Sequence, residues 1–233
     1  MANADAQKRA AGEAAAREVQ DGMAVGLGTG STAAWFVRAL GERALTEGLD
    51  LRCVATSEVT ARLALEVGLT CEDLDVVRTL DLTVDGADEI SPDLVLIKGG
   101  GGALLREKLV WQASERCLVI ADEGKLSDCL GTFPLPVEVT PFGHTTTAAR
   151  IADVVGVEPL LRLRGEEPFR TDGGNLIYDL SLGVIEDVDW LDWALKVVTG
   201  VVDHGLFIGL ADDALIGRDD GVEPIIRPIV GDR

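Results

Sequence analysis

A glycine-rich segment, Gly26-Leu-Gly-Thr-Gly-Ser-Thr32, lies between an apolar run at residues 23–27 and a predicted helix at residues 33–43. At such a junction the backbone N–H groups and the helix dipole attract anions, and glycine lets the backbone approach a ligand closely. Ser31 replaces the third glycine of a dinucleotide motif, and no lysine precedes it as in a Walker A loop. We therefore expect the loop to bind the phosphate of a small ligand, with a plain tight turn as the alternative.

Two carboxylates, Asp85 and Asp88, follow a predicted strand at residues 82–85 within Val84-Asp-Gly-Ala-Asp-Glu-Ile90. The carboxyl edge of a parallel sheet is where doubly wound folds bind their ligands. Paired carboxylates there can bind sugar hydroxyls or move a proton, although a turn capped by aspartate side chains explains them equally well. Glu89, one residue further, fits a solvated or capping position.

Lys98 leads from a predicted strand at residues 94–97 into four glycines, Gly99–Gly102. Such a flexible run is costly to order unless its backbone must approach a ligand. Glu107 follows in a predicted helix at residues 102–114, where, taken alone, it fits an exposed carboxylate paired with a basic neighbour. The groups at the neighbouring strand ends favour a functional role, because together they offer a base, an oxyanion stabiliser and a phosphate anchor.

The elements that must position these residues alternate between strand and helix through the first half of the chain. An alanine-rich helix is predicted at residues 4–20. The remaining predicted elements of this half are a strand at 51–55, a helix at 57–67 and a strand at 117–121. The alternation indicates an α/β fold with a doubly wound, Rossmann-like parallel sheet.

The pattern changes after Gly131, where three prolines mark a junction. The elements that follow have the order β-α-β-β-α-β, which is typical of a ferredoxin-like α+β domain. They are predicted at residues 137–140, 145–155, 159–163, 175–179, 189–198 and 201–207. Because the segments 214–217 and 222–230 are expected to return to the first sheet, the prediction is a Rossmann-like catalytic domain at residues 1–131 and 208–233 and a smaller domain at 132–207.

The 233-residue chain is strongly acidic, with 21 Lys and Arg against 40 Asp and Glu and a net charge of −19. Such a charge repels nucleic acid and anionic lipid, so neither is an expected partner. No apolar run approaches the ~20 residues of a membrane span, and the N-terminus lacks the apolar core of a signal peptide, so we expect a cytoplasmic protein. Lysine accounts for only five residues, which suggests adaptation to high salt; full stability and activity in dilute buffer would overturn that hypothesis.

The cysteines and histidines form no metal-binding pattern. No C-x-x-C pair occurs and the only histidines are His144 and His204, so neither a zinc cluster nor a disulfide framework is expected. We expect structural histidines and buried, reduced thiols. The isolated cysteines are Cys53, Cys71, Cys117 and Cys129.

Taken together and in this order, the motifs resemble the type A ribose-5-phosphate isomerases over nearly the whole chain. The resemblance extends to Arg106-Glu-Lys108, residues 121–125, Phe133-Pro-Leu-Pro-Val-Glu-Val139, Thr171-Asp-Gly-Gly-Asn175, and Gly205-Leu-Phe207 with Ala214-Leu-Ile-Gly217. It implies interconversion of ribose 5-phosphate and ribulose 5-phosphate without metal or cofactor, by a homodimer or homotetramer whose partner is a small sugar phosphate. The segment after His204 is shorter than the family's pattern, which puts that loop but no catalytic position in question.

By this resemblance Glu107 matches the family's catalytic base, which moves a proton between C2 and C1 of the open-chain sugar through an enediolate. Lys98 would stabilise the developing oxyanion, while Asp85 would assist ring opening and hold sugar hydroxyls together with Asp88. The other substrate-binding positions that it implies are Thr29, Gly30, Ser31, Thr32, Gly86, Ala87, Gly99, Gly100, Gly101, Lys125 and Lys8. In so acidic a protein we expect the three lysines of this set to form a locally positive pocket.

Two other functions compete with the isomerase. A non-catalytic module that senses a sugar phosphate could share the fold and the phosphate loop. Glu107, Lys98 and Asp85 argue for the enzyme, and no basic helix-turn-helix segment supports a DNA-binding regulator. A nicotinamide-dependent dehydrogenase is disfavoured by Ser31 and by Glu58, which precedes a helix instead of ending the second strand.

Overall fold

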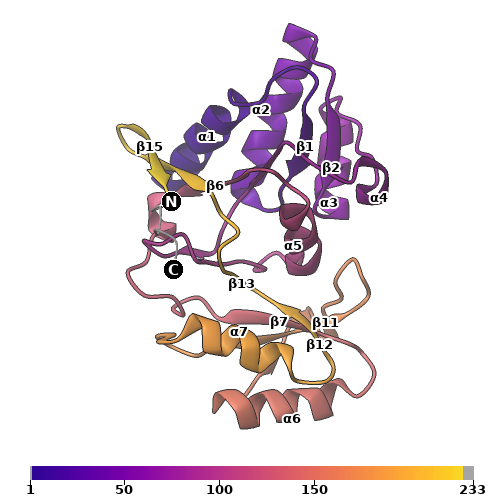
Figure 1. Ribbon diagram of the computed structural model, residues 1–233, viewed down its shortest axis with the longest axis vertical. Coiled ribbons are helices and arrows are strands. Elements are labelled where there is room, and N and C mark those ends of the chain that lie inside the picture. The colour runs from indigo at the N-terminus through magenta and orange to yellow at the C-terminus, as the bar shows by residue number, and fades with distance from the viewer. Residues whose placement is uncertain (1, 228–233) are drawn as a thin grey trace.

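The computed structural model describes residues 2–227, and its central element is a six-stranded sheet with the order β15-β14-β6-β3-β1-β2 (Figure 1). These strands are β1 (Ala24–Leu27), β2 (Arg52–Ala55), β3 (Leu82–Asp85), β6 (Cys117–Asp122), β14 (Asp213–Arg218) and β15 (Gly221–Ile226). All neighbours are parallel except β15, which pairs antiparallel with β14 at the edge. The parallel α/β sheet is therefore confirmed. The predicted strand at 222–230 is present as β15, and residues 228–230 of it lie outside the described residues.

Helices cover both faces of this sheet, because successive side chains of each buried strand point to opposite faces. One face packs against α1 (Ala2–Ala16), α2 (Ser31–Glu47) and α3 (Glu58–Glu66) in a single apolar cluster. The other face packs against α5 (Leu104–Gln112) and the short α4 (Leu74–Val77). The helix predicted at 4–20 ends at Ala16, and α4 is absent from the sequence prediction.

A separate three-stranded antiparallel sheet, β13-β5-β4, lies beside the large one. It consists of β4 (Glu89–Ile90), β5 (Leu96–Ile97) and β13 (Leu206–Phe207). The expectation that residues 94–97 continue the parallel sheet is therefore wrong. Ser91 and Leu94 form a tight turn, with the Leu94 amide bonded to the Ser91 carbonyl at 3.0 Å and Leu94 at a φ of 57°. This turn folds β5 back on β4, so residues 94–97 do not join the parallel sheet.

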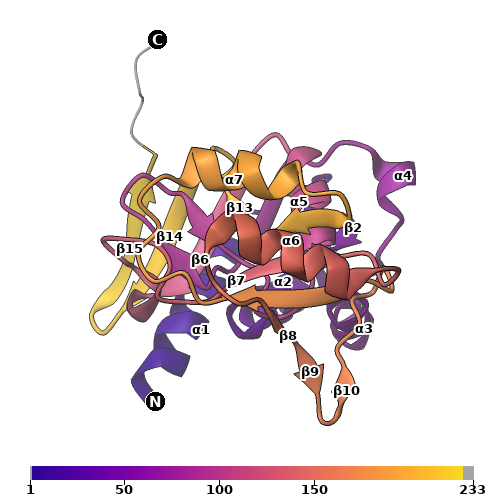
Figure 2. The ribbon, with the colours of Figure 1, turned by 90° about the horizontal axis from the view of Figure 1, so that it is seen from below.

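A smaller α+β unit follows, with the strand order β12-β7-β11-β8 (Figure 2). Its elements are β7 (Leu135–Val139), α6 (His144–Val155), β8 (Leu160–Leu161), β11 (Leu176–Leu180), α7 (Val188–Lys196) and β12 (Val201–His204). All neighbouring strands are antiparallel, and α6 and α7 pack on one face of them in a second core. In the order of the chain this is the 4-1-3-2 arrangement of a ferredoxin-like unit, as the β-α-β-β-α-β pattern predicts.

Two connections differ from the sequence prediction. The strand predicted at 201–207 divides at Gly205, whose amide bonds the Pro136 carbonyl at 2.8 Å and whose carbonyl accepts the Lys98 amide at 2.9 Å. The chain thus passes there from the small sheet to β13, beside Lys98. A projecting hairpin, β9 (Leu163–Arg164) with β10 (Glu167–Pro168), is also absent from the prediction. A 3-10 turn, η1 (Glu123–Lys125), follows β6.

The thiols and the helices bear on two further expectations. Cys53 and Cys117 are buried and Cys71 is half-buried, but Cys129 is exposed, so the expectation of buried thiols is wrong there. All four are free.

None of the helices between residues 2 and 227 has the length and apolarity that a membrane crossing requires.

Candidate active site

Asp85, the last residue of β3, is held rigidly at the carboxyl edge of the large sheet. Its side chain is fully buried, and Oδ1 accepts the amides of Thr29 at 2.9 Å and Gly86 at 2.7 Å. The loop after β1 can come this close only because residue 28 is glycine: a Cβ there would lie 2.2 Å from Asp85 Oδ1. The remaining oxygen, Oδ2, is thereby directed at Lys98.

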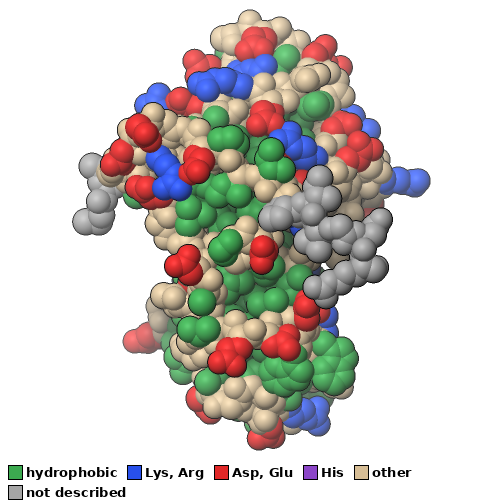
Figure 3. Space-filling view, turned by 60° about the vertical axis from the view of Figure 1, so that its left-hand side comes forward, with side chains coloured by type: hydrophobic (Ala, Val, Ile, Leu, Met, Phe, Trp, Pro, Cys, Tyr) green, Lys and Arg blue, Asp and Glu red, His purple; other side chains and the backbone are tan. Residues whose placement is uncertain are grey.

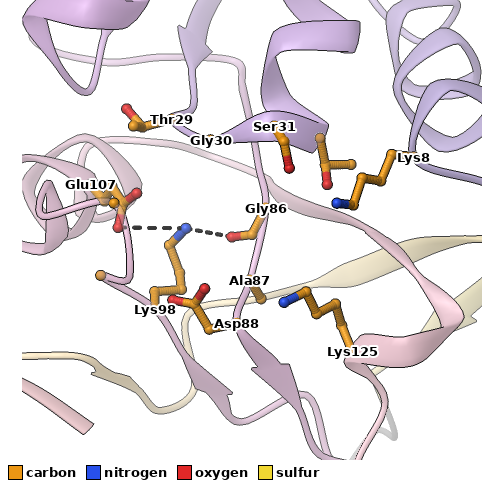
Figure 4. Close-up of a pocket in the computed structure, with 13 residues that line it drawn as sticks. Lys8, Thr29, Gly30, Ser31, Gly86, Ala87, Asp88, Lys98, Glu107 and Lys125 are labelled. Atoms are coloured by element: carbon orange, nitrogen blue, oxygen red, sulfur yellow. Dashed lines mark hydrogen bonds and ion pairs between the residues drawn. The ribbon is translucent and has the colours of Figure 1, made fainter. Parts of the chain in front are cut away.

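Lys98 follows β5 and places its ammonium between the carboxylates of Asp85 and Glu107, and Figure 4 shows its contacts with Glu107 and the Gly86 carbonyl. Nζ lies 3.0 Å from Asp85 Oδ2 and 3.6 Å from Glu107 Oε2, and it donates a hydrogen bond to the Gly86 carbonyl. The side chain is only 2% exposed. Burial by itself would lower the pKa of Lys98, but Asp85 and Glu107 outweigh it and the pKa is raised. The site therefore holds a fixed positive charge.

Glu107 is the fourth residue of α5, and it is buried, contrary to the exposed position that it would be given in isolation. Its Oε2 accepts no hydrogen bond from the described residues and faces the Lys98 ammonium. Burial raises the pKa of Glu107 to about 8; Lys98 opposes this shift, and the nearby Asp85 and Asp88 add to it. A carboxyl group that titrates near neutral pH is suited to taking up and returning a proton.

Asp88 holds the glycine run after Lys98 in place through a hydrogen bond to its backbone. Asp88 Oδ2 accepts the Gly100 amide at 2.8 Å, and Gly99 and Gly101 contribute to the wall of the same cavity as Asp88. The neighbouring Glu89 is buried and accepts the backbone amides of residues 131 and 133, so it caps that loop. The sequence left open whether these aspartates cap backbone N–H groups or contact a ligand. Asp88 accepts a backbone N–H and also lines the cavity.

The other end of the cavity carries the groups expected to bind phosphate. Helix α2 begins at Ser31 with Gly30 as its N-cap, so its first N–H groups and the hydroxyls of Ser31 and Thr32 lie at the cavity wall. Lys8 reaches it from α1 and Lys125 from η1, and Figure 4 shows both side chains directed toward it. Among residues 2–227 neither lysine forms an ion pair. Helix dipole and lysines together make this end attractive to an anion.

One of the predicted phosphate ligands is engaged elsewhere. The Thr29 hydroxyl lies within 2.7 to 3.1 Å of the hydroxyls of Thr56, Ser57 and Thr60, and its amide is bonded to Asp85. Thr29 therefore anchors the loop to the start of α3, and the donors left for an anion belong to residues 30–32. In the sequence, the hydroxyl residues Thr56, Ser57 and Thr60 around the start of α3 are the feature that indicates this contact.

The structure brings nearly all of the predicted residues together around one cavity. Asp85 lies behind Lys98 and Gly100 behind Asp88, so neither contributes to the cavity wall. Lys108, next to Glu107 in sequence, points away and bonds Asp203 Oδ1 and the His204 carbonyl, each at 2.7 Å. The lining residues are Lys8, Thr29, Gly30, Ser31, Thr32, Gly86, Ala87, Asp88, Lys98, Gly99, Gly101, Glu107 and Lys125.

Both histidines lie away from this cavity. His204 is fully buried, with Nε2 3.2 Å from Asp192 Oδ1, and burial lowers its pKa. His144 Nδ1 lies 2.8 Å from the Tyr178 hydroxyl. These contacts are within the smaller α+β unit, as expected of structural histidines.

Comparison with known proteins identifies relatives along almost the whole chain. Residues 52–221 match the family model described as ribose 5-phosphate isomerase A (phosphoriboisomerase A). The ribose-5-phosphate isomerase A of Caulobacter vibrioides is 60% identical over 224 residues, which cover 94% of this chain and 97% of that one. The corresponding protein of Jannaschia sp. is 55% identical, with 93% and 85% covered.

Solved structures show the same similarity. Ribose 5-phosphate isomerase A from Methanocaldococcus jannaschii has a TM-score of 0.89 at 37% identity and covers 94% of this chain and 98% of its own. The Plasmodium falciparum ribose 5-phosphate isomerase has a TM-score of 0.92 at 36% identity, covering 96% and 99%. A D-ribose-5-phosphate isomerase in complex with phospho-erythronic acid has a TM-score of 0.92 at 34% identity, covering 97% and 100%.

Proposed function

This chain belongs to the ribose 5-phosphate isomerase A family, which interconverts ribose 5-phosphate and ribulose 5-phosphate, and we propose that Glu107 is the base that moves the proton. The relatives are named as isomerases, so the comparisons favour the enzyme over the non-catalytic sensing module. The observation that carries the mechanism is the position of Lys98. Its ammonium lies between Asp85 and Glu107 at one end of a cavity whose other end holds a helix N-terminus and two lysines that form no ion pair within residues 2–227.

In the proposed reaction the Glu107 carboxylate removes the proton from C2 of the open-chain aldose. The C2–H electron pair forms the C1–C2 double bond, and the carbonyl electrons move to O1, giving an enediolate. The Lys98 ammonium stabilises this oxyanion from a position that requires no rearrangement. Glu107 then returns the proton to C1, a proton passes from O2 to O1, and C2 becomes the ketone. No atom is gained or lost, and no oxidant is required.

Asp85 has a different role from the one that the resemblance implies. Its side chain is fully buried and not part of the cavity wall, so the expected contact with sugar hydroxyls is not supported by this structure. We propose that Asp85 keeps Lys98 charged and oriented, because it receives two backbone amides on one oxygen and faces the ammonium with the other. Asp88 remains the carboxylate that can meet sugar hydroxyls, and any assistance to ring opening by Asp85 would act through Lys98.

We propose that the substrate phosphate binds at the opposite end, between the first turn of α2 and the two lysines. Ser31 and Thr32 would donate hydroxyl and amide hydrogen bonds, and Lys8 and Lys125 would neutralise the phosphate charge. Three of the chain's five lysines line this cavity. An anion can thus find a locally positive site in a protein of net charge −19.

The decisive experiment is turnover of ribose 5-phosphate, with a chelator present, by wild type and Glu107→Gln. The substitution keeps the size of the side chain and removes the base, so we expect kcat to fall by about 1,000-fold or more. Glu58→Gln, an exposed glutamate of α3, is the matched control and is expected to leave kcat unchanged.

Binding is measured separately, with phospho-erythronic acid as the probe, because a relative's structure holds this compound. Glu107→Gln is expected to bind it, which separates loss of chemistry from loss of fold. A wild type that binds the acid but does not turn over the sugar phosphate would contradict the isomerase, and an active Glu107→Gln would contradict the proposed base.

We also propose a homodimer or homotetramer that works in the cytoplasm. Trp190 and Trp193 of α7 and Val197 at its C-terminal cap are 49%, 62% and 57% exposed, an apolar stripe that a monomer would leave in water. Figure 3 shows further hydrophobic side chains gathered across the middle and lower part of one face. The free thiols agree with a reducing compartment. Light scattering gives the mass, and a monomer at micromolar concentration would contradict the oligomer; cell fractionation tests the location.

A further inference from the structure

The glycine run between Lys98 and α5 determines how Lys98 and Glu107 face each other. Lys98 is fixed on one side by its backbone bond to Gly205, and Glu107 is fixed on the other by α5. Four glycines lie between the end of β5 and the residue that precedes α5. Glycine has the largest conformational freedom of any residue, so such a segment keeps one conformation only if other groups hold it.

A side chain from the smaller α+β unit holds the carbonyl side of this run. Arg162 Nη1 donates to the Gly99 carbonyl at 2.8 Å and to the Gly100 carbonyl at 3.1 Å. Asp88 Oδ2 accepts the Gly100 amide from the opposite direction. The backbone around Gly100 is thus clamped by a cation on its carbonyls and an anion on its N–H, which are the partners that each group prefers.

Arg162 is itself held in place. Its guanidinium forms a two-pronged ion pair with Asp179, with Nε 2.9 Å from Oδ2, and its side chain is 15% exposed. Its backbone is bonded on both sides, through N–H to the Ile177 carbonyl at 2.8 Å and through its carbonyl to the Phe169 amide at 2.9 Å. An arginine fork that is already fixed loses little freedom when it forms its remaining bonds.

Phe169 supports the glycine run further along the chain, at Gly102. Its ring lies against Gly102, where a Cβ would come within 2.3 Å of the ring, and the Arg162 guanidinium lies 6.0 Å from the ring centroid. Gly102 also has a φ of 80°, which favours glycine. The smaller unit therefore contacts the glycine run as far as Gly102, two positions before α5 begins.

We propose that Arg162 is a positioning residue for the isomerisation: from the smaller α+β unit it fixes the glycine run so that Lys98 and Glu107 keep their mutual geometry. Arg162 does not line the cavity and touches no reacting atom. It acts through the Gly99 and Gly100 carbonyls, and it makes the smaller unit part of the catalytic apparatus. The inference rests on the proposed function only in taking Lys98 and Glu107 as the reacting pair.

The test compares Arg162→Met with Arg164→Met. Arg164 is the matched control: it is exposed two positions along, and its guanidinium lies 4.8 Å from the same Phe169 ring. No hydrogen bond in the described part of the chain joins Arg164 to the glycine run. Because a misplacement of about 1 Å can cost on the order of 100-fold in rate, we expect Arg162→Met to lower kcat by about 10- to 100-fold. Arg164→Met is expected to keep the wild-type kcat.

A second readout separates positioning from a general loss of structure. Within the described residues the side chain of Arg162 bonds only Asp179, Gly99 and Gly100, none of which belongs to the phosphate end. The dissociation constant for inorganic phosphate, measured by calorimetry, should therefore stay within about twofold in Arg162→Met. Addition of guanidinium ion to Arg162→Ala should restore part of kcat, whereas wild type and Arg164→Met should show no gain. Arg162→Lys keeps the charge without the planar fork, and we expect an intermediate kcat. If the Arg162→Met and Arg162→Ala variants fail to fold, the kcat of Arg162→Lys alone decides the test.

Wild-type kcat in a folded Arg162→Met or Arg162→Lys would overturn the inference, and so would an equal loss in Arg164→Met. Loss of phosphate binding in step with kcat would assign Arg162 a structural role instead. These outcomes remain distinct from failure of the proposed function, because that failure appears in the wild type and in Glu107→Gln.

Discussion

The two ends of the cavity are built on opposite principles. At the reacting end Asp85, Lys98 and Glu107 are at most 3% exposed, and each is fixed by another charge or by the backbone. At the phosphate end Ser31 is exposed, and Lys8 and Lys125 are half-buried without ionic partners among the described residues. One end is buried and its charged groups are paired with one another, whereas the other is partly exposed and its lysines have no ionic partner in the described part of the chain.

This difference follows from what each end must do. Proton transfer to carbon needs a base whose pKa is near neutral and an oxyanion site that is already oriented, and both require exclusion of water. A phosphate dianion needs only reachable positive charges and N–H donors, which function in contact with solvent. Changes at the reacting end should therefore act on kcat, and changes at the phosphate end on KM.

After Glu107→Gln, the largest effect is expected from Lys98→Met. The substitution removes the charge that stabilises the enediolate, and loss of one such group costs on the order of 100- to 1,000-fold in kcat. It also leaves the two buried carboxylates without their common cation, so the pKa of Glu107 should rise further. The measurement is kcat at saturating ribose 5-phosphate, together with circular dichroism to establish folding.

Lys196→Met provides the control for Lys98→Met, because Lys196 is a half-exposed lysine of α7 that pairs with Asp192 outside the cavity. It should retain wild-type kcat. A folded Lys98→Met with kcat within threefold of wild type would show that the ammonium is not the oxyanion stabiliser.

The next effect is on the pH profile. Because the base acts as a carboxylate and burial raises the pKa of Glu107 to about 8, kcat/KM should fall about tenfold for each pH unit below that value and level off above it. The phosphate of the substrate titrates near pH 6, about two units below that pKa, so the upper part of this limb reports Glu107. A profile that is flat between pH 6 and 9 would contradict a strongly buried Glu107.

The same group has a consequence for stability. The pKa of Glu107 is higher in the folded chain than the ~4.3 of an unfolded glutamate, so folding favours its protonated form. Its contribution is complete at acid pH and is lost as the pH rises through about 8. The Tm of wild type should therefore decline more steeply between pH 6 and 9 than that of Glu107→Gln, which cannot ionise.

How far the sequence predicts each end depends on the range of the contacts involved. The phosphate end is made from a local signal: a glycine-rich turn between a strand and a helix exposes N–H groups whatever the rest of the fold does. Sequence spacing alone therefore places residues 30–32 at the start of a helix, and in the structure they lie at the start of α2 in the cavity wall. The reacting end is different, because Glu107 in isolation fits an exposed helix position. The neighbouring Asp85 and Lys98 favour a functional role for it, but the sequence does not predict that it is buried.

What the sequence does not predict are contacts between segments far apart in the chain. Arg162 lies between the short strands β8 and β9 with no motif around it, and its bonds to Gly99 and Gly100 depend on how the smaller unit packs. The Thr29 hydroxyl is hydrogen-bonded to the hydroxyls of Thr56, Ser57 and Thr60, which belong to a different strand–helix junction. Side-chain pairing across such distances is decided by tertiary packing.

Lys125→Ala tests the phosphate end. Loss of one charged hydrogen bond of roughly 1.5–3 kcal/mol should raise KM for ribose 5-phosphate by about tenfold or more, with kcat within about twofold of wild type. Lys125→Arg, which keeps the charge, should recover most of the affinity. An unchanged KM in the alanine variant would remove Lys125 from the site, and a loss in kcat alone would abolish the division between the two ends.

Ionic strength should have the smallest effect, and it probes both ends at once. In dilute buffer the net charge of −19 repels the dianionic substrate over a Debye length of about 30 Å, which shrinks to about 10 Å at 0.1 M salt. The lysines of the phosphate end act at contact distance and are screened less by this change. We therefore expect KM to fall by about two- to threefold from 0.01 to 0.1 M KCl, while kcat, which is set by buried groups, stays constant. Steady-state kinetics at several salt concentrations measures both. A kcat that changes with salt while KM stays fixed would mean that the reacting end is open to solvent, against the burial of Lys98 and Glu107.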